Sequence, residues 1–462
     1  MRRVKTSTLI ALTVVVGLIS GCGSSITDVE PIAEEEKEPE KIEIVDLSDA
    51  WETILNNSTK EFIGGHPIDE TFLSIVTAEY GDDIIEEIAS YANYETPEIW
   101  YELTGKSIHV LWYEYCMLTG IQRYATENTY VIDADSDDIV IDFTGDLTLA
   151  ENVGTTLYMD QQMNGIIDCF SDDLLTEMQS ADILMVNNEF TYTNSDTALV
   201  GKAYTFRADP TRVSLLSEIG VDAVGVANNH VYDYDITGFI DTLTTLDGAG
   251  IPYVGAGENL EEASEPLYFI IGGRKIAVVA ATQIERTLNY TKEATETTPG
   301  VMKCLHPEVF CNEIAEASEN ADYVIVYPHW GTEGNANYGA DQVALARAFV
   351  EAGADVIIGG HTHCLQTVEY IDDVPIYYSL GNYYFSVTGT MPADYDTGLA
   401  QVRIHSDGSI DTYFLPCQFH SGVVSLLDEE DTAYSDIINS LNNLSTTAVI
   451  DESGRICKNS TE

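Results

Sequence analysis

From about residue 138 onward, short apolar runs alternate with stretches of helical periodicity, and this alternation constrains the fold most. The apolar runs are short enough to be buried strands, at 139–143, 183–186, 223–227, 323–327 and 356–358. Amphipathic stretches lie between them, at 211–219, 236–249, 307–320 and 340–352. Such alternation predicts a parallel sheet covered by helices. After Val374 the runs come closer together and Asp407-Gly408 is a hairpin signal, which predicts antiparallel strands that complete the sheet.

The N-terminus has the organisation of an export signal. Three basic residues in the first five positions precede an apolar run at 9–19, which is too short for a comfortable membrane span. The run ends in Ile-Ser-Gly-Cys22, which resembles the lipobox of bacterial lipoproteins. We therefore expect a lipoprotein signal peptide at 1–22 and a protein that is lipid-anchored to the cell membrane through Cys22, outside the cytoplasm. An uncleaved anchor helix is the alternative.

The remaining chain divides by composition. Residues 23–45 are rich in Ser and Glu and cannot bury a core, so we expect an acidic disordered tether. Residues 46–130 have apolar positions at helical spacing and predict a small helical accessory domain. The main domain is expected at 138–427 and a C-terminal tail at 428–462.

The charge of the chain argues against a nucleic-acid-binding protein, and its cysteine count bears on disulfide pairing. The chain has 20 Lys and Arg against 77 Asp and Glu, a formal charge of −57, which would repel nucleic acid. Of eight cysteines, seven remain once Cys22 is lipidated, an odd number for an oxidising compartment. Cys304 and Cys311 are close enough to pair, although spacing cannot establish connectivity.

Candidate metal ligands follow the predicted strands. They lie in the segments Gly145-Asp146, Asn187-Asn188-Glu189, Asn228-Asn229-His230, His329-Trp330 and Gly359-Gly360-His361-Thr362-His363. Because the carboxyl ends of parallel strands meet along one edge of a sheet, these residues are expected to converge in one crevice. Carboxylate, imidazole and amide ligands together suit a divalent Zn, Mn or Fe ion, which the sequence does not distinguish.

Single members of this set have simpler explanations. Asp146 could cap a turn, and a buried histidine is more often a satisfied core residue than a ligand. His361 and His363 favour a metal most strongly, because alternate positions of a strand point both rings to the same side. A polar crevice that binds carbohydrate or peptide is the alternative for the whole set.

Several motifs follow one another in order between residues 139 and 385. They are Gly145-Asp146, Asn188-Glu189, Ala227-Asn228-Asn229-His230 with Asp233, His329-Trp330-Gly331 with Glu333, Gly360-His361-Thr362-His363 and Tyr378-Ser379-Leu380-Gly381-Asn382. Their order resembles that of the poly-gamma-glutamate capsule biosynthesis (CapA) family and is similar to that of calcineurin-like metallophosphoesterases. The resemblance implies an α/β fold, a four-layer α/β sandwich of metallophosphoesterase type, which holds two metals.

The resemblance also implies how the ligands divide. It places Asp146 and His363 at one metal, Glu189 between the two metals, and Asn229, His329 and His361 at the other. The chain departs from the pattern at Thr148, where the phosphoesterases have a second ligand. We therefore expect one firmly held divalent metal and a second one that is short of a ligand. Asp235 stands where many CapA-like sequences have Gly.

Other polar residues are candidates for catalysis and substrate binding. His230 matches the residue that protonates the leaving oxygen in the phosphoesterases, and Asp233 could orient it. The alternative is a polar turn at 228–230 that begins a helix. Arg207, as a carboxylate or phosphate clamp, and Glu333 are candidate substrate-binding residues, although a surface salt bridge explains either equally well.

Two functions follow as hypotheses. The first is a metal-dependent hydrolase or transferase that acts on an anionic envelope polymer such as poly-gamma-glutamate during capsule biosynthesis. The second is a non-catalytic accessory or scaffold that binds the subunits of a membrane polymer synthase or export complex. A solute-binding lipoprotein has less support, because two equal α/β lobes are not evident.

Overall fold

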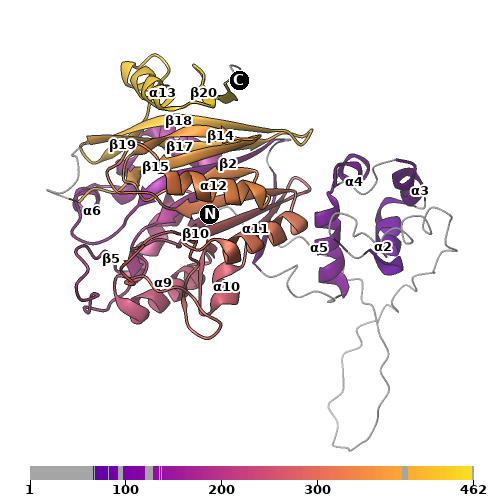
Figure 1. Ribbon diagram of the computed structural model, residues 1–462, viewed down its shortest axis with the longest axis horizontal. Helices are drawn as coiled ribbons and strands as arrows, with labels where there is room; N and C mark the ends of the chain where they lie inside the picture. The colour runs from indigo at the N-terminus through magenta and orange to yellow at the C-terminus, as the bar shows by residue number, and fades with distance from the viewer. Residues whose placement is uncertain are drawn as a thin grey trace, which may run out of the picture. The chain divides into compact units, whose positions relative to one another are not determined.

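The computed structural model describes residues 66, 68–81, 83–91, 97–119, 128–134, 136, 138–387 and 394–459. The expected signal peptide, the lipidated Cys22 and the acidic tether lie outside these ranges. The chain divides into two compact units, 1–127 and 128–462, which are described separately here (Figure 1). No helix within the described ranges is both long and apolar enough to span a membrane.

The smaller unit is helical. It contains α2 (Glu70–Tyr80), α3 (Ile84–Ala89), α4 (Pro97–Thr104) and α5 (Ile108–Thr119). The Asp69 side chain caps α2 by accepting a hydrogen bond of 2.8 Å from the Phe72 amide. Phe72, Trp100 and Trp112 are buried in one core. His66 and His109 are also buried and form a ring-to-ring hydrogen bond of 2.9 Å, so both are packed histidines.

The larger unit contains two mixed sheets. The first has the order β19 (Val423–Leu426), β18 (Ile410–His420), β17 (Asp394–Ile404), β2 (Ile139–Leu147), β3 (Ile183–Asn188), β6 (Ala223–Gly225), β7 (Tyr253–Val254), and β16 (Asn382–Tyr384) pairs with β2. The second has the order β1 (Thr129–Ile132), β9 (Leu267–Ile271), β10 (Arg274–Thr282), β12 (Tyr323–His329), β13 (Val356–Ile358), β15 (Val374–Leu380), β14 (Leu365–Ile371). Short two-stranded pairs are β4 (Thr191–Tyr192) with β5 (Arg207–Ala208), β8 (Ala256–Gly257) with β11 (Gly300–Val301), and β20 (Ala448–Ile450) with β21 (Ile456–Lys458).

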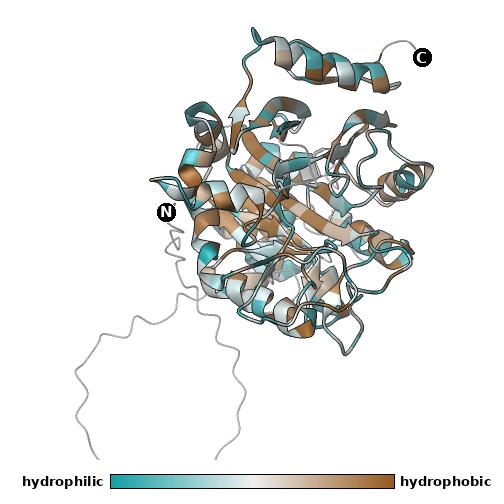
Figure 2. Ribbon diagram, turned by 90° about the vertical axis from the view of Figure 1, so that its left-hand side faces the viewer, coloured by the Kyte–Doolittle hydropathy of each residue, from teal (hydrophilic) through white to brown (hydrophobic). Residues whose placement is uncertain are grey.

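The two sheets pack face to face, and helices cover their outer faces. Along β3, Ile183 and Met185 enter the core between the sheets, whereas Leu184 and Val186 pack on helices, as the period of two in a strand requires. The helical elements of this unit are α6 (Gly154–Met159), η1 (Gly165–Cys169), α7 (Asp172–Ser180), η2 (Pro210–Val213), α8 (Ser214–Glu218), α9 (Asp235–Ala249), α10 (Leu260–Ser264), α11 (Glu308–Asn320), α12 (Ala340–Glu351) and α13 (Thr432–Leu444). Residues of α7, α8 and α9 pack on the first sheet, and those of α11 and α12 pack on the second. Hydrophobic strands accordingly fill the interior in Figure 2, and the fold is the four-layer α/β sandwich that the family resemblance implies.

The five predicted strands do not form one sheet. Strands β2, β3 and β6 belong to the first sheet, whereas β12 and β13 belong to the second. A strand that is buried on both faces reads as a continuous apolar run, so its sequence does not reveal which sheet it joins.

Both ends of the larger unit differ from the expected boundaries. Strand β1 begins at Thr129 and pairs with β9, so the larger unit begins before residue 138. Residues 428–462 were expected to be a tail, but α13 buries Tyr434, Ile437 and Leu441 in the core between the sheets, and β20–β21 follows. Cys304 and Cys311 are not paired, since Cys304 is fully buried and the Cys311 thiol faces the carbonyl oxygen of Ala348.

Candidate metal centre

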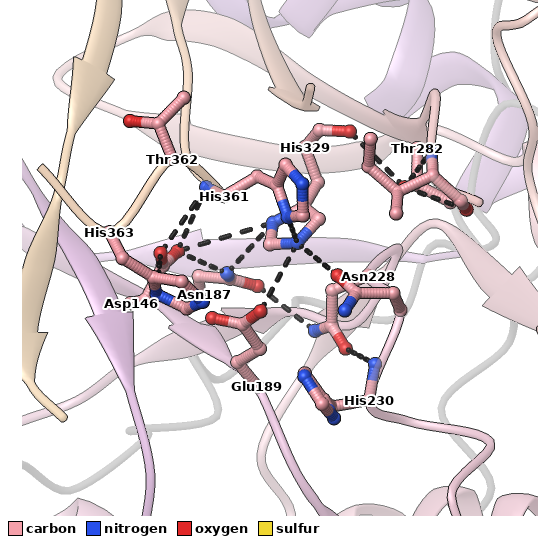
Figure 3. A network of polar contacts seen from close by, with 12 residues as sticks. Asp146, Asn187, Glu189, Asn228, His230, Thr282, His329, His361, Thr362 and His363 are labelled. Carbon is pink, nitrogen blue, oxygen red and sulfur yellow. Dashed lines mark hydrogen bonds and ion pairs between the residues drawn. The ribbon is translucent and has the colours of Figure 1, made fainter. Parts of the chain in front are cut away.

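The carboxyl ends of strands from both sheets meet at one buried cluster of polar side chains. Asp146 lies in β2, Glu189 follows β3, His329 ends β12, and His361 and His363 follow β13 (Figure 3). Their ligand atoms form two groups, Glu189–His329–His361 and Asp146–Glu189–His363, and within each group the atoms lie within 4.8 Å of one another. Glu189 belongs to both groups, so the structure brings these five sequence-predicted residues together around one shared carboxylate.

Asn229 joins the first of these groups. Its side-chain oxygen lies 2.7 Å from His329 Nε2, and that same nitrogen lies 3.3 Å from Glu189 Oε1 and 3.1 Å from His361 Nδ1. An amide oxygen, a carboxylate oxygen and two imidazole nitrogens therefore face one point. Such a donor set suits a divalent transition metal.

The close approach of two glycines positions Asp146. A Cβ atom on Gly145 would lie 2.0 Å from the carbonyl oxygen of Gly381, so only glycine fits at this place. The Asp146 amide donates a hydrogen bond of 2.8 Å to the same carbonyl. The glycines of the Gly145-Asp146 and Leu380-Gly381-Asn382 motifs thus let β2 and the 379–382 segment meet directly beneath the site.

The two histidines after β13 do not extend the strand, which corrects the expectation of alternate strand positions. Strand β13 ends at Ile358, and His361 and His363 have φ angles of 90° and 58°, in the left-handed region. A residue with a side chain adopts this region at a cost of about 1–3 kcal/mol, and such strain is concentrated at functional sites. The turn sends the two rings to different groups of ligands rather than to the same side.

Hydrogen bonds to neighbouring residues orient the candidate ligands. Asp146 Oδ1 accepts a bond of 2.7 Å from the Asn187 amide group, which also lies 3.2 Å from His329 Nδ1. His363 Nδ1 lies 2.7 Å from Asn382 Oδ1 and 3.5 Å from Asp146 Oδ2. Outer contacts of this kind fix ring orientation in metal sites.

Burial shifts the acid–base properties of the cluster. Burial lowers the pKa of His329 to about 3 and that of His361 well below its usual value, so both rings are neutral and able to bind a cation. Burial opposes ionisation of Asp146 as well, but His363 and His329 hold its pKa below the usual value. Burial, together with the charges of Asp146 and Glu333, raises the pKa of Glu189 well above the ordinary range.

Glu189 shows that the residues fit a cation. Its side chain is fully buried, and neither carboxylate oxygen accepts a hydrogen bond from any residue that the structure describes. A buried polar group without a partner is costly, and a carboxylate is among the costliest. A divalent ion between Glu189 and the surrounding imidazoles would satisfy both oxygens.

His230 lies beside the cluster but outside both ligand groups. Its Nδ1 atom lies 2.7 Å from Asp233 Oδ2, and its ring lies 4.5 Å from that of Phe206, measured between centroids. The amide oxygen of Asn228 accepts bonds of 3.0 Å from the His230 and Val231 amides, so it holds the turn that presents His230. The helix α9 begins after this turn. Residues 228–230 therefore form the polar turn that was the alternative explanation, and His230 is paired with Asp233 in the same turn.

Two departures from the family pattern have structural explanations. The hydroxyl group of Thr148 accepts a hydrogen bond of 3.2 Å from the Ala150 amide, so it stabilises the chain after β2. Asp235 has a φ angle of 55°, and this left-handed conformation is the one that glycine adopts without strain.

The two candidate substrate-binding residues have other contacts. Arg207 forms ion pairs with Asp196 at 2.8 Å and with Glu151 at 3.7 Å. Glu333 is exposed on the loop after β12 and acts electrostatically on Glu189 and His363. The sequence analysis missed Lys202, whose ammonium group reaches Asp233; no local pattern around this lysine marks it.

Comparison with known proteins identifies the family of this chain. The family model described as "Bacterial capsule synthesis protein PGA_cap" matches residues 140–387, more than half of the chain. The chain belongs to this family. The PGA_cap region contains all of the candidate metal ligands as well as His230 and Asp233.

Three relatives illustrate the similarity. "Capsule biosynthesis protein CapA" of Bacillus anthracis is 33% identical over 225 residues, which are 47% of this chain and 53% of that protein. "PGA biosynthesis protein CapA" of Bacillus subtilis (strain 168) is 32% identical over 245 residues, 53% of this chain and 63% of that protein. A "Probable polyglutamine synthesis accessory protein" of Mycobacterium tuberculosis is 28% identical over 214 residues, 45% of this chain and 56% of that protein. The chain thus spans between half and two thirds of the length of these relatives.

A solved structure also matches at low similarity. It is the 5'-nucleotidase from Candida albicans SC5314, with a TM-score of 0.36 and 13% sequence identity, over 67% of this chain and 58% of that one.

Proposed function

We propose that this PGA_cap protein is a metal-dependent hydrolase or transferase that acts on a bond in an envelope polymer during capsule or poly-gamma-glutamate biosynthesis. The observation that carries the proposal is the fully buried Glu189 carboxylate, which belongs to both groups of ligands and accepts no hydrogen bond from the residues that the structure describes. The His230–Asp233 pair beside it supplies a group for proton transfer.

The chain's own residues have distinct roles in this proposal. Glu189, His329, His361 and Asn229 would hold one divalent ion, and Asp146 and His363 would hold a second one with Glu189. When bound, such an ion supplies a Lewis acid that polarises a phosphoryl or acyl centre and makes water more acidic. His230 Nε2 would give a proton to the leaving group, while Asp233 accepts a hydrogen bond from Nδ1 and fixes the ring and its tautomer. Phe206 packs on the His230 ring and keeps water away from that side.

The family and the sequence support a class of substrate and a location. The names of the two Bacillus relatives concern capsule and PGA biosynthesis, which supports an anionic polymer such as poly-gamma-glutamate as the substrate and the subunits of a membrane polymer synthase as partners. The lipobox-like sequence that ends at Cys22 supports a lipid anchor in the cell membrane, with the folded units outside the cytoplasm. The metal is a divalent Zn, Mn or Fe ion.

Product release tests the proposal. Wild type and His230→Ala, adjusted to equal metal content, are incubated with poly-gamma-glutamate and with a generic phosphodiester. We expect turnover of one of these substrates by wild type and a loss of about 100-fold or more in the variant, the usual range for a general acid. Equal rates in both proteins would exclude His230 as the acid, and no turnover of either substrate would argue against an enzyme.

The name of the mycobacterial relative supports a second function, a non-catalytic accessory of polymer synthesis. A scaffold has no need for a proton donor. Full complementation of a deletion strain by His230→Ala would therefore favour the accessory function, whereas failure of complementation by a folded, metal-loaded variant would favour the enzyme.

A further inference from the structure

Lys202 has a buried side chain in a connection most of whose residues are partly or fully exposed. Residues 193–206 link β4 to β5 without regular secondary structure, and nearby Val200 is 93% exposed. The Lys202 side chain, in contrast, is only 7% exposed. Burying a lysine is costly unless its charge is paired, so its contacts identify what it stabilises.

The Lys202 ammonium group contacts both parts of the site. It donates to Asp233 Oδ1 at 2.5 Å and to the main-chain carbonyl oxygen of Asn229. Glu285 Oε1, on a second loop, lies 3.7 Å away. One side chain therefore connects the partner of His230 with the backbone of a candidate metal ligand.

These contacts complete the surroundings of Asp233. Its Oδ2 atom accepts bonds from the Phe206 amide at 2.6 Å and from His230 Nδ1 at 2.7 Å, while Lys202 occupies Oδ1. Asp233 is fully buried, so no solvent competes for these positions. With donors on both oxygens, the carboxylate cannot rotate away from the imidazole.

We propose that Lys202 is a positioning residue that fixes the Asp233 carboxylate, and through it the His230 ring, in the orientation needed for proton transfer. This inference rests on the proposed function. It assigns Lys202 no contact with the substrate. Because Lys202 acts through His230, its removal should affect kcat rather than KM and should have little effect once His230 is absent.

A purely structural role makes a different prediction. If Lys202 only fastened the 193–206 connection to the core, its removal would lower activity by a similar factor whether or not His230 is present. A double-mutant cycle separates the two roles, because coupling is confined to residues that act as one unit. The cycle comprises wild type, Lys202→Met, His230→Ala and the double variant.

The experiment uses the full chain with equal metal content and bis(p-nitrophenyl) phosphate as the probe. We expect Lys202→Met to lower kcat by about 10–100-fold, the usual effect of an outer contact in a metal site, with KM within about twofold. In the His230→Ala background the further loss should be below about twofold. Lys292→Met is the matched control, because this lysine lies on the neighbouring loop and its ammonium group donates a hydrogen bond to the carbonyl oxygen of Asn289. The kcat of this variant should equal that of wild type. Lys202→Arg keeps the charge and should retain more activity than Lys202→Met, and it replaces the methionine variant in the cycle if that variant does not fold.

Hydrogen exchange provides a readout that does not need turnover. The Phe206 amide donates to Asp233 Oδ2, so release of this carboxylate should make the Phe206 amide exchange faster in Lys202→Met than in wild type or in Lys292→Met. Equal losses in both backgrounds of the cycle, or an unchanged kcat, would overturn the proposal. If wild type does not turn over the probe, the proposed function fails on this substrate. The exchange measurement alone then decides whether Lys202 fixes Asp233. Unchanged exchange at the Phe206 amide would overturn the proposal.

Discussion

His361 and His363 are two positions apart, yet their rings belong to different groups of candidate ligands. His361 lies with Glu189 and His329, whereas His363 lies with Asp146 and Glu189. The left-handed φ angles of both residues produce this divergence. One short turn after β13 therefore contributes to both halves of the site.

The divergence predicts different metal losses for the two single variants. His361→Ala should remove the ion held with His329 and Asn229, and His363→Ala should remove the ion held with Asp146, which is the weaker one because Thr148 is no ligand. The double variant should lose most of the metal. Elemental analysis after removal of adventitious ions measures this, with His420→Ala as the control, because His420 is exposed and pairs with Asp394. Full retention of metal by the double variant would eliminate the site.

Gly145 offers a test of how the backbone supports Asp146. In Gly145→Ala the new Cβ atom would meet the Gly381 carbonyl oxygen at 2.0 Å, so the two chain segments must separate. We expect a loss of about 1–3 kcal/mol in the free energy of unfolding, as for other overpacked sites, and weaker metal binding. Gly248→Ala is the matched control, since its Cβ atom would meet nothing within 4 Å and alanine favours the helix by up to about 1 kcal/mol. Equal stability of the two variants would contradict this explanation.

The ligand cluster could be predicted from the sequence because it depends on one local rule. Polar residues at the carboxyl ends of buried parallel strands meet at one end of the strands, and Asp146, Glu189 and His329 lie at such ends. The two-sheet arrangement came from the family resemblance and not from periodicity, because β3 and β12 are equally apolar and equally buried.

Other parts of the site depend on contacts between distant residues. Lys202 lies 31 positions from Asp233, in a connection without regular secondary structure, and no local pattern marks this lysine as buried. The left-handed turn at 361–363 is also invisible to strand periodicity. Helix α13 was expected to be part of a C-terminal tail, although Tyr434, Ile437 and Leu441 recur at helical spacing and pack in the core.

Asp142 predicts a pH-dependent stability. This residue lies in β2, fully buried, and accepts a hydrogen bond of 3.0 Å from Gln401. Burial, and to a smaller extent the nearby Glu177, raises the pKa of Asp142 to about 8. In the unfolded chain Asp ionises near pH 4, at about 3.9. Between these two pH values Asp142 is ionised in the unfolded chain and protonated in the folded one, so folding takes up a proton and the stability falls as the pH rises.

Asp142→Asn removes that ionisation. The stability of the variant relative to wild type should therefore increase between pH 4 and pH 8, by at most about 1.4 kcal/mol for each pH unit. Below pH 4 Asp142 is protonated in both the folded and the unfolded protein, so the difference in stability between the variant and wild type should be constant. Denaturant unfolding of the two proteins in matched buffers measures the difference, and a difference that is the same at every pH would show that Asp142 is ionised in the folded protein.

The N-terminal sequence predicts a lipid anchor. Metabolic labelling with a fatty-acid analogue should mark the wild-type protein, and Cys22→Ser should abolish both the labelling and retention in the membrane fraction. Cys457→Ser, which changes a cysteine far from the lipobox, should leave both unchanged. Labelling that persists in Cys22→Ser would show that the lipobox assignment is wrong.

The positive groups near the site are largely neutralised by ion pairs. Arg207 pairs with Asp196 and Glu151, and Arg286 pairs with Asp341 at 2.8 Å. The formal charge of −57 is therefore not balanced by a free basic patch at these positions. An anionic polymer approaching the protein should be repelled, and the repulsion acts over roughly a Debye length, about 8 Å at physiological ionic strength.

This repulsion predicts an unusual response to salt. For poly-gamma-glutamate as substrate, KM should fall as NaCl is raised from low concentration to about 150 mM, because screening weakens the repulsion between polymer and protein surface. Added divalent cations should lower KM further by neutralising the polymer. For a small neutral ester that the protein turns over, KM should not change with salt, which makes that ester the control. A KM that rises with salt would show instead that attraction by basic residues dominates binding, as in proteins that hold polyanions through lysine and arginine contacts.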